Sequence, residues 1–322
     1  MNGIALSDPA ARISMFSEVI VFSTYATYIV MSFMMLVMIY MLLPQAQVSA
    51  ERINEVLDRR ASVREGKTET AKEAGTVSFR NVSFRYPGSG EDELSDISFD
   101  IGKGQTLAII GATGSGKTTL VSLIARFYDA TSGEVLVDGV NVKNYTFDAL
   151  YDRIGYVTQK AVLFAGTVKD NIFFGESAAE NSGENLSSAL SLSQSEEFVS
   201  RLDGGADYEI VQLGRNVSGG QKQRLSIARA LARKPEILIF DDSFSALDYR
   251  TDAALREGLA KELPETTKII VAQRISTVRH ADRIIVLDRG EAVGTGTHDE
   301  LMKTCPVYRE IAESQLSASE LR

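Results

Sequence analysis

Some residue types are scarce in this 322-residue sequence. Cys305 is its only cysteine, so an intrachain disulfide is excluded and the thiol is expected to be a free structural one, as in proteins that fold in reducing compartments. Basic residues are in deficit, because 34 Lys and Arg face 43 Asp and Glu and give a net charge of -9. No basic patch is visible, so a nucleic-acid partner is not expected. With 44% apolar and 24% charged residues, the chain is neither disordered nor fibrous.

Charge is absent altogether from one segment. No charged residue lies between Glu18 and Glu51, and Val19 to Leu43 is almost continuously apolar. As a helix, those positions would extend roughly 37 Å at ~1.5 Å per residue, which exceeds a hydrocarbon core of ~30 Å. The segment therefore predicts a transmembrane helix over residues 17–44, in contact with membrane lipid.

The flanks of this span indicate its orientation. Only Arg12 precedes it, whereas four arginines follow it: Arg52, Arg59, Arg60 and Arg64. The positive-inside rule then predicts a cell-membrane location, with residues 1–16 as an extracytoplasmic lead and the C-terminal side in the cytoplasm. A cleaved signal peptide is the alternative, because Val48-Ser49-Ala50 resembles a cleavage site.

Beyond the span, the sequence changes character. Residues 45–75 are expected to extend the helix into the cytoplasm and to end in a charged linker, 65–75. Strand-length apolar runs then alternate with helix-length segments, which predicts an α/β domain with a mainly parallel sheet over residues 76–315, followed by a tail over 316–322. The expected strands include 106–110, 237–240, 268–271 and 283–287, and the expected helices 118–127, 221–233 and 251–261. Ser177 to Ser195 is predicted to be an exposed segment that joins a smaller helical part.

The motif GATGSGKTT matches the pattern G-x-x-x-x-G-K-[ST] at every fixed position. A strand leads into this loop and an apolar helix leaves it, so main-chain N–H groups and the helix N-terminus can hold the phosphates of ATP. Lys117 is expected to supply positive charge to the phosphates, and the Thr118 hydroxyl to bind Mg²⁺. The predicted nucleotide-binding residues of this loop are Gly111, Gly114, Ser115, Gly116, Lys117, Thr118 and Thr119.

Asp241 follows the strand-like run ILIF downstream of the loop. A carboxylate at that edge of the sheet can hold Mg²⁺ through water, so Asp241 is a predicted magnesium and nucleotide residue.

The segment between these two motifs indicates a family. Val217 to Gln221 (VSGGQ), followed by KQRLSIARAL, resembles the signature of ATP-binding cassette (ABC) ATPases. The resemblance implies that Tyr86 stacks on adenine, that Gln159 binds nucleotide and Mg²⁺, and that residues 245–248 form the D-loop. The sequence VSAERINEVLD, residues 48–58, is similar to the end of the last transmembrane helix of bacterial multidrug and peptide exporters. The expected fold is thus an α/β P-loop NTPase, an ABC cassette with a helical subdomain, preceded by one transmembrane helix.

The signature also suggests a partner. A serine N-cap followed by bare glycine amides makes a second anion site at a helix N-terminus. In the resembled family this site serves ATP held by another subunit, which implies a role in trans for Ser218, Gly219, Gly220 and Gln221. The expected partner is a second ABC exporter subunit.

Two positions depart from the family pattern. Asp242 stands where a glutamate, whose side chain is one methylene longer, is usual in the family. Gln273 stands where a histidine is usual. Loss of a positioned acid or base costs about 10²- to 10⁴-fold in rate, so this ATP site is predicted to be slow. An intact signature beside a degenerate site resembles one subunit of a heterodimeric exporter; the alternative is a homodimer in which Asp242 still works.

One helix cannot enclose a translocation path, so the chain is expected to be truncated at its N-terminus relative to the six-helix subunits it resembles. The predicted function is ATP binding and hydrolysis coupled to export of a drug, lipid or peptide. Two alternatives stay open: a nucleotide-binding regulatory fragment without transport, and a soluble ABC ATPase of DNA maintenance. His280 and His298 are expected to be structural, with His298 capping the last helix.

Overall fold

The structure, a computed structural model, describes residues 9–175 and 183–315. Contacts between Cα atoms divide the chain into two units, residues 1–62 and 63–322, which we describe separately.

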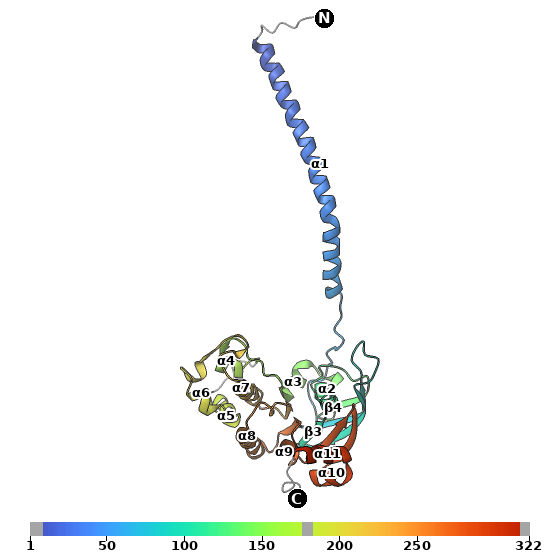
Figure 1. Cartoon of the computed structure of the whole chain (residues 1–322), viewed down its shortest axis with the longest axis vertical. Coiled ribbons are helices and arrows are strands. Elements are labelled where there is room, and N and C mark those ends of the chain that lie inside the picture. The colour runs from blue at the N-terminus through green and yellow to red at the C-terminus, as the bar shows by residue number, and fades with distance from the viewer. Residues whose placement is uncertain (1–8, 176–182, 316–322) are drawn as a thin grey trace. The chain divides into compact units, whose positions relative to one another are not determined.

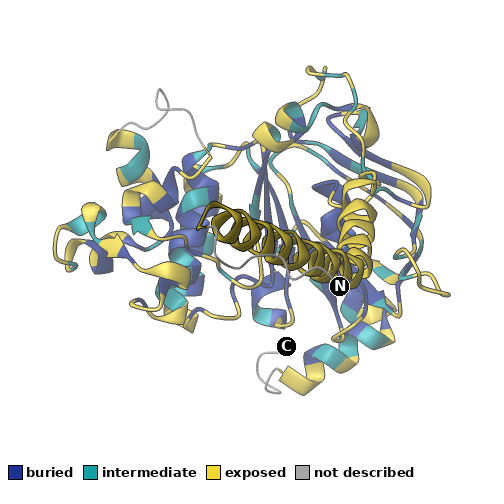
Figure 2. Ribbon diagram, turned by 90° about the horizontal axis from the view of Figure 1, so that it is seen from above, coloured by how far each residue is buried: buried dark blue, intermediate teal, exposed yellow. Residues whose placement is uncertain are grey.

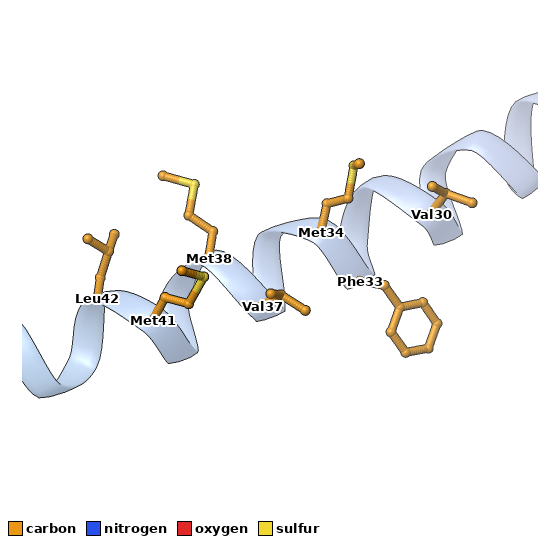
Figure 3. A pocket seen from close by; sticks show the side chains of 7 residues that line it. All are labelled: Val30, Phe33, Met34, Val37, Met38, Met41 and Leu42. Atoms are coloured by element: carbon orange, nitrogen blue, oxygen red, sulfur yellow. The ribbon is translucent and has the colours of Figure 1, made fainter.

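The first unit is a single helix, α1 (Pro9–Leu57), which continues through Pro44 and has no buried residue. Within the described part of the chain it is the one helix that is long and apolar enough to cross a membrane. It begins before the predicted span and ends after it. Hydroxyls on the helix bond to the carbonyl four residues earlier, as Thr24 does to Ile20, so they need no other partner in an apolar medium. Figure 3 shows seven apolar side chains, from Val30 to Leu42, projecting from the helix surface.

The second unit is built on a six-stranded sheet in the order β12-β11-β3-β10-β9-β6. All neighbouring pairs are parallel except β11 and β12. The strands are β3 (Thr106–Gly111), β6 (Ile154–Val157), β9 (Ile237–Asp241), β10 (Thr267–Val271), β11 (Arg283–Asp288) and β12 (Glu291–Gly296). β9 and β10 are buried along their whole length, as strands of a parallel sheet covered on both faces must be. The predicted α/β domain with a mainly parallel sheet is confirmed.

A second, antiparallel sheet has the order β2-β1-β4-β5, formed by β1 (Val77–Phe84), β2 (Leu94–Ile101), β4 (Ser132–Val137) and β5 (Val140–Asn141). Its inward residues form one hydrophobic core together with α2 (Lys117–Ile124) and one face of the large sheet. The stacked rings of Phe79 and Phe99, 4.5 Å apart, join β1 to β2 within it. A two-stranded sheet pairs β7 (Gly166–Thr167) with β8 (Glu209–Ile210).

The other face of the large sheet packs against helices in a second core. The remaining helices are α3 (Phe147–Arg153), α4 (Val168–Ile172), α5 (Gly183–Leu192), α6 (Glu196–Ser200), α7 (Gly219–Ala232), α8 (Tyr249–Glu262), α9 (Ile275–Val278), α10 (His298–Thr304) and α11 (Pro306–Gln315), with short 3-10 turns at 142–144, 205–207 and 212–214. In Figure 1, α4, α5, α6 and α7 gather on one side of the second unit, and Figure 2 shows buried residues, in dark blue, on both strands and helices of that unit.

Two expectations, one about an exposed segment and one about a helix cap, were wrong. Of the stretch 177–195, residues 177–182 lie outside the described residues, but the rest is not an exposed connection: it forms α5, which packs on α7, and Ser193 and Ser195 are fully buried. The two hydroxyls bond to each other at 2.9 Å, which satisfies them away from water. His298 does not cap the last helix, because Thr297 is the N-cap of α10 and α11 follows it.

Main-chain bonds tie the start of the second unit to its body. The N–H groups of Gly66 and Thr68 donate to the carbonyls of Tyr145 and Asn144 at 2.9 and 2.8 Å, and Thr68 forms a parallel bridge with Tyr145. These residues belong to the segment 65–75 that the sequence predicts as a linker.

Candidate active site

The loop between β3 and α2 contains the glycine-rich motif. β3 ends at Gly111, whose main chain lies so close to β11 that an added Cβ would be 2.1 Å from the Leu287 carbonyl oxygen. Gly116, the N-cap of α2, has φ +94°, a left-handed conformation that residues other than glycine adopt only with strain. The strand, the loop and the helix therefore have the order and backbone shape that a phosphate cradle requires.

Lys117 lies at the centre of this loop and is 7% exposed. Its Nζ donates to the main-chain oxygens of Gly111 and Ala112 at 2.9 and 2.6 Å and lies 3.3 Å from Ser115 Oγ. Burial lowers the pKa of Lys117, and the negative charges of Asp242 and Asp241 oppose that shift. The three N–H donors of the ammonium group are thus directed at loop oxygens, and a phosphate oxygen would take the place of one of these acceptors.

Thr118 and Asp241 meet at the end of the central strands. The Thr118 hydroxyl donates to Asp241 Oδ1 at 2.9 Å, and Tyr156 OH donates to Asp241 Oδ2 at 3.2 Å. Burial raises the pKa of Asp241, and these two hydrogen bonds oppose that shift. A hydroxyl and a carboxylate are the oxygen ligands that Mg²⁺ accepts. Thr118 and Asp241 supply one of each. Among the described residues no group of three or more His, Cys, Asp and Glu could hold a metal.

Asp242 receives two amide donors on one oxygen. Gln159 Nε2 and Gln273 Nε2 lie 3.0 and 2.9 Å from Asp242 Oδ2. The structure thus brings together three predicted site residues from the segments after β6, β9 and β10, although they are far apart in the sequence. With the glycine-rich loop they line a cavity of about 170 Å³, whose lining residues are Glu93, Thr113, Gly114, Gly116, Lys117, Thr118, Thr119, Gln159, Asp242, Val271 and Gln273.

The signature residues begin α7. Ser218 is its N-cap: Ser218 Oγ accepts from the N–H of Gln221 at 3.3 Å, and Gln221 Oε1 accepts from the N–H of Ser218 at 2.8 Å. A Cβ at Gly219 would meet nothing within 4 Å, so the helix N-terminus beside it is open. None of residues 218–221 lines the cavity around Lys117. Within one chain the two candidate anion sites are therefore separate.

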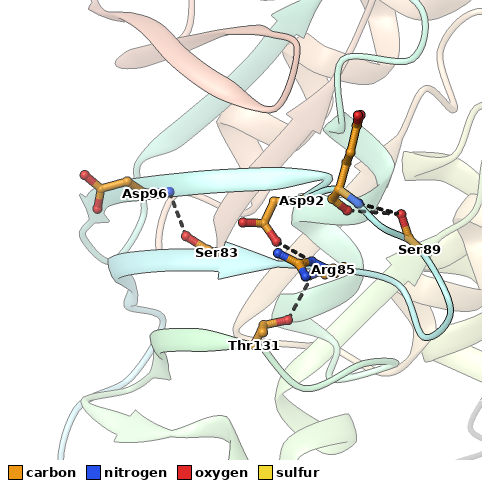
Figure 4. Close-up of polar contacts among 7 residues, drawn as sticks. Ser83, Arg85, Ser89, Asp92, Asp96 and Thr131 are labelled. Carbon is orange, nitrogen blue, oxygen red and sulfur yellow. Dashed lines mark hydrogen bonds and ion pairs between the residues drawn. The ribbon is translucent and has the colours of Figure 1, made fainter.

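Tyr86 lies in the hairpin between β1 and β2. Its hydroxyl is 2.9 Å from Thr119 Oγ1, and its ring packs edge-on against Phe84 and Tyr128. Figure 4 shows the contacts that order this hairpin: Arg85 is ion-paired with Asp92 at 2.9 Å, and its N–H donates to Thr131 Oγ1 at 3.0 Å. The aromatic ring predicted to stack on adenine is thereby placed beside α2.

The sequence interpretation missed several residues of this site, among them Thr113 and Val271, which line the cavity. Tyr156, whose hydroxyl bonds to Asp241, belongs to the same YVTQ segment as Gln159, so its position three residues before that glutamine was the available signal. Glu93 reaches the cavity from the end of the β1–β2 hairpin, and nothing in its local sequence marks it.

Comparison with known proteins gives consistent matches. Residues 94–245 match the family described as ABC transporter. The chain is 45% identical over 307 residues to an uncharacterized ABC transporter ATP-binding protein of Mycobacterium bovis. The aligned residues cover 94% of the chain and 52% of the relative. It is 41% identical over 267 residues to an ATP-dependent lipid A-core flippase of Albidiferax ferrireducens, at 83% of the chain and 46% of the relative.

Among solved structures, a bacterial Atm1-family ABC exporter with ATP bound matches 88% of the chain and 50% of its own, at a TM-score of 0.80 and 33% identity. The chain thus spans about half the length of the relatives it matches.

Proposed function

From the ABC transporter ATP-binding domain that residues 94–245 form, we propose that the chain is an ATP-binding and ATP-hydrolysing subunit of an ABC exporter. In this proposal α1 binds the chain to the cell membrane, and the ATPase unit lies in the cytoplasm. The observation that carries the proposal is the loop of residues 111–118: its buried Lys117 lines a cavity together with Asp242 and Thr118, and the Thr118 hydroxyl donates to Asp241.

In this proposal each part of the site has one task. The main-chain N–H groups of the loop and Lys117 bind the β- and γ-phosphates, and Tyr86 stacks on the adenine. Thr118 and Asp241, with Gln159, hold Mg²⁺, which supplies charge neutralisation to the transferred phosphoryl group. Asp242 is the group nearest in sequence to Asp241 that can orient the attacking water.

We propose further that hydrolysis at this site is slow. The Asp242 side chain is one methylene shorter than that of a glutamate, so its carboxylate reaches less far toward an attacking water. An amide at position 273 carries no positive charge, whereas a protonated imidazole would. Both features reduce the catalytic power available to a bound water.

The open N-terminus of α7 supports a two-subunit arrangement. Ser218 and the amides of Gly219 and Gly220 form an anion site that does not reach the chain's own cavity, so the ATP it serves belongs to a second subunit. Combined with the Asp242 and Gln273 departures, this favours a heterodimer whose partner holds the faster site. The exported substrate belongs to the drug, lipid or peptide classes.

Nucleotide binding is tested by replacing Lys117. The Lys117→Ala variant should bind a fluorescent ATP analogue with Mg²⁺ about 10- to 100-fold more weakly, because a charge-assisted contact to phosphate is lost. Lys261→Ala is the matched control, since Lys261 is exposed on α8 outside the cavity. Equal affinity in all three proteins would refute the proposal.

The two-subunit arrangement is tested by mixing. Purified with the product of a neighbouring transporter gene that carries Glu and His at the matching positions, the chain should show an ATPase rate well above the sum of the separate rates. Additive rates would favour a nucleotide-binding regulatory protein or a homodimer.

A further inference from the structure

Gln315, the last residue of α11, makes two hydrogen bonds to the loop that carries Gln273. Its Nε2 donates to the Gln273 carbonyl oxygen at 2.8 Å, and its Oε1 accepts from the N–H of Ile275 at 2.9 Å. One amide side chain thus holds the main chain on both sides of Arg274, across 40 residues of sequence.

The second of these bonds supplies a missing helix cap. Ile275 begins α9, and Arg274, its N-cap, makes no side-chain capping bond. The first N–H groups of a helix have no partner within the helix, and Ile275 is fully buried, so its N–H depends on an acceptor from elsewhere in the fold. Gln315 Oε1 is that acceptor. The direction in which the chain enters α9 therefore depends on a residue of α11.

The helix that carries Gln315 is firmly anchored. Tyr308 and Ala312 of α11 are fully buried in the core of the second unit. The Tyr308 hydroxyl is 2.7 Å from His298 Nδ1, which joins α11 to α10. Gln315 is thus carried by a helix whose inner face is buried in that core, and two hydrogen bonds join the loop to this helix.

A cavity lies beside the loop on its other side. A cavity of about 340 Å³ adjoins Asp242, Gln273 and Gln315. Where packing is incomplete, hydrogen bonds determine the main-chain position. Gln273 then extends its amide to Asp242 Oδ2, so two consecutive hydrogen bonds, joined through Gln273, lead from α11 to the carboxylate.

We propose that Gln315 is a positioning residue of the ATP site: it sets the Gln273 loop so that the Gln273 amide orients the Asp242 carboxylate. The proposal rests on the proposed function, because it assumes that Asp242 orients the attacking water. Gln315 itself does not line the cavity around Lys117, so its effect reaches the reaction only through Gln273.

The test compares three variants of the full chain. Gln315→Ala removes both bonds; Gln315→Glu keeps the acceptor for Ile275 but sets a carboxylate against the Gln273 carbonyl. Ser314→Ala is the control, because its hydroxyl bonds only within α11, to Ile311. Phosphate release at saturating ATP should fall roughly three- to tenfold in both Gln315 variants and stay unchanged in Ser314→Ala, with ATP affinity equal throughout.

A double-mutant cycle separates positioning from general destabilisation. In a Gln273→Ala background, Gln315→Ala should cause no further loss of turnover, because the residue through which it acts is gone. The inference would be overturned if Gln315→Ala caused the same loss in that background as in the unaltered chain. It would also be overturned if Gln315→Ala and the unaltered chain had equal turnover, including no turnover in either. Failure of the unaltered chain to bind ATP would instead overturn the proposed function, and the inference with it.

Discussion

Replacing Asp242 by glutamate should raise the ATPase rate of this chain. The added methylene lengthens the side chain by one C–C bond of ~1.5 Å, so the carboxylate moves by about 1 Å or more toward the cavity that holds Lys117. A misplacement of ~1 Å can cost about 10²-fold in rate, and a positioned general base contributes ~10² to 10⁴. We therefore expect Asp242→Glu to increase turnover on the order of 10²-fold, close to 3 kcal/mol of barrier.

The same change should destabilise the fold slightly. Asp242 has φ +48°, a left-handed conformation that aspartate tolerates better than longer side chains do. A cost of ~1 kcal/mol would lower the melting temperature by about 2–4 °C in a unit of this size. A faster but less stable variant is the expected combination.

The assay is steady-state phosphate release by the purified chain, with fluorescent ATP binding measured in parallel. Asp242→Asn is the matched control, because it keeps the shape of the side chain but removes its charge, and it should bind ATP and hydrolyse even less. If Asp242→Glu bound ATP normally and turned over no faster than the unaltered chain, the argument from side-chain length would be refuted.

Two other predictions follow from separate parts of the second unit. Gly219→Asp should leave folding and ATP affinity unchanged, because an acidic residue suits the first turn of α7 and a Cβ at that position meets nothing within 4 Å. It should lower the ATPase rate of the two-subunit mixture at least tenfold, because its carboxylate repels phosphate. An unchanged rate of the mixture would exclude a role of Gly219 in trans. Burial, with the negative charge of Glu236, raises the pKa of Asp138 to about 6 despite Arg153. The folded state therefore binds more protons than the unfolded state between pH ~4 and 6, and this contribution falls as pH rises through that window. Between pH 4 and pH 7 the free energy of unfolding, measured with urea, should fall by about 1–3 kcal/mol less in Asp138→Asn than in the unaltered chain. If the substitution changed the free energy of unfolding by the same amount at both pH values, the assignment would be contradicted.

The sequence predicted those parts of the site whose chemistry is local. The spacing from Gly111 to Thr118 is set by the contact of main-chain amides with phosphate, so the motif itself predicts the strand, the loop and the helix around it. The Ser218 cap is equally local, because a serine and a glutamine three residues apart satisfy each other's N–H groups. Such features depend on neighbours in the chain and can be read without the fold.

The contacts that tune the site could not be predicted in this way. Gln159, Asp242 and Gln273 share one oxygen only because β6, β9 and β10 lie side by side in the sheet. The cap that Gln315 provides joins residues 40 positions apart. The burial of α5 was missed because its serine-rich sequence resembles an exposed connection, while Ser193 and Ser195 satisfy each other inside the core.

The bonds from Lys117 to the carbonyls of its own loop have a consequence for how ligands arrive. Those bonds hold the loop in its curved shape from within, so an incoming triphosphate meets a cradle that is already formed. The loss of conformational entropy on ordering the loop then occurs during folding, so it does not weaken nucleotide affinity. Binding at this site should accordingly be fast and insensitive to loop dynamics, with its selectivity set by how many oxygens a ligand can present at once.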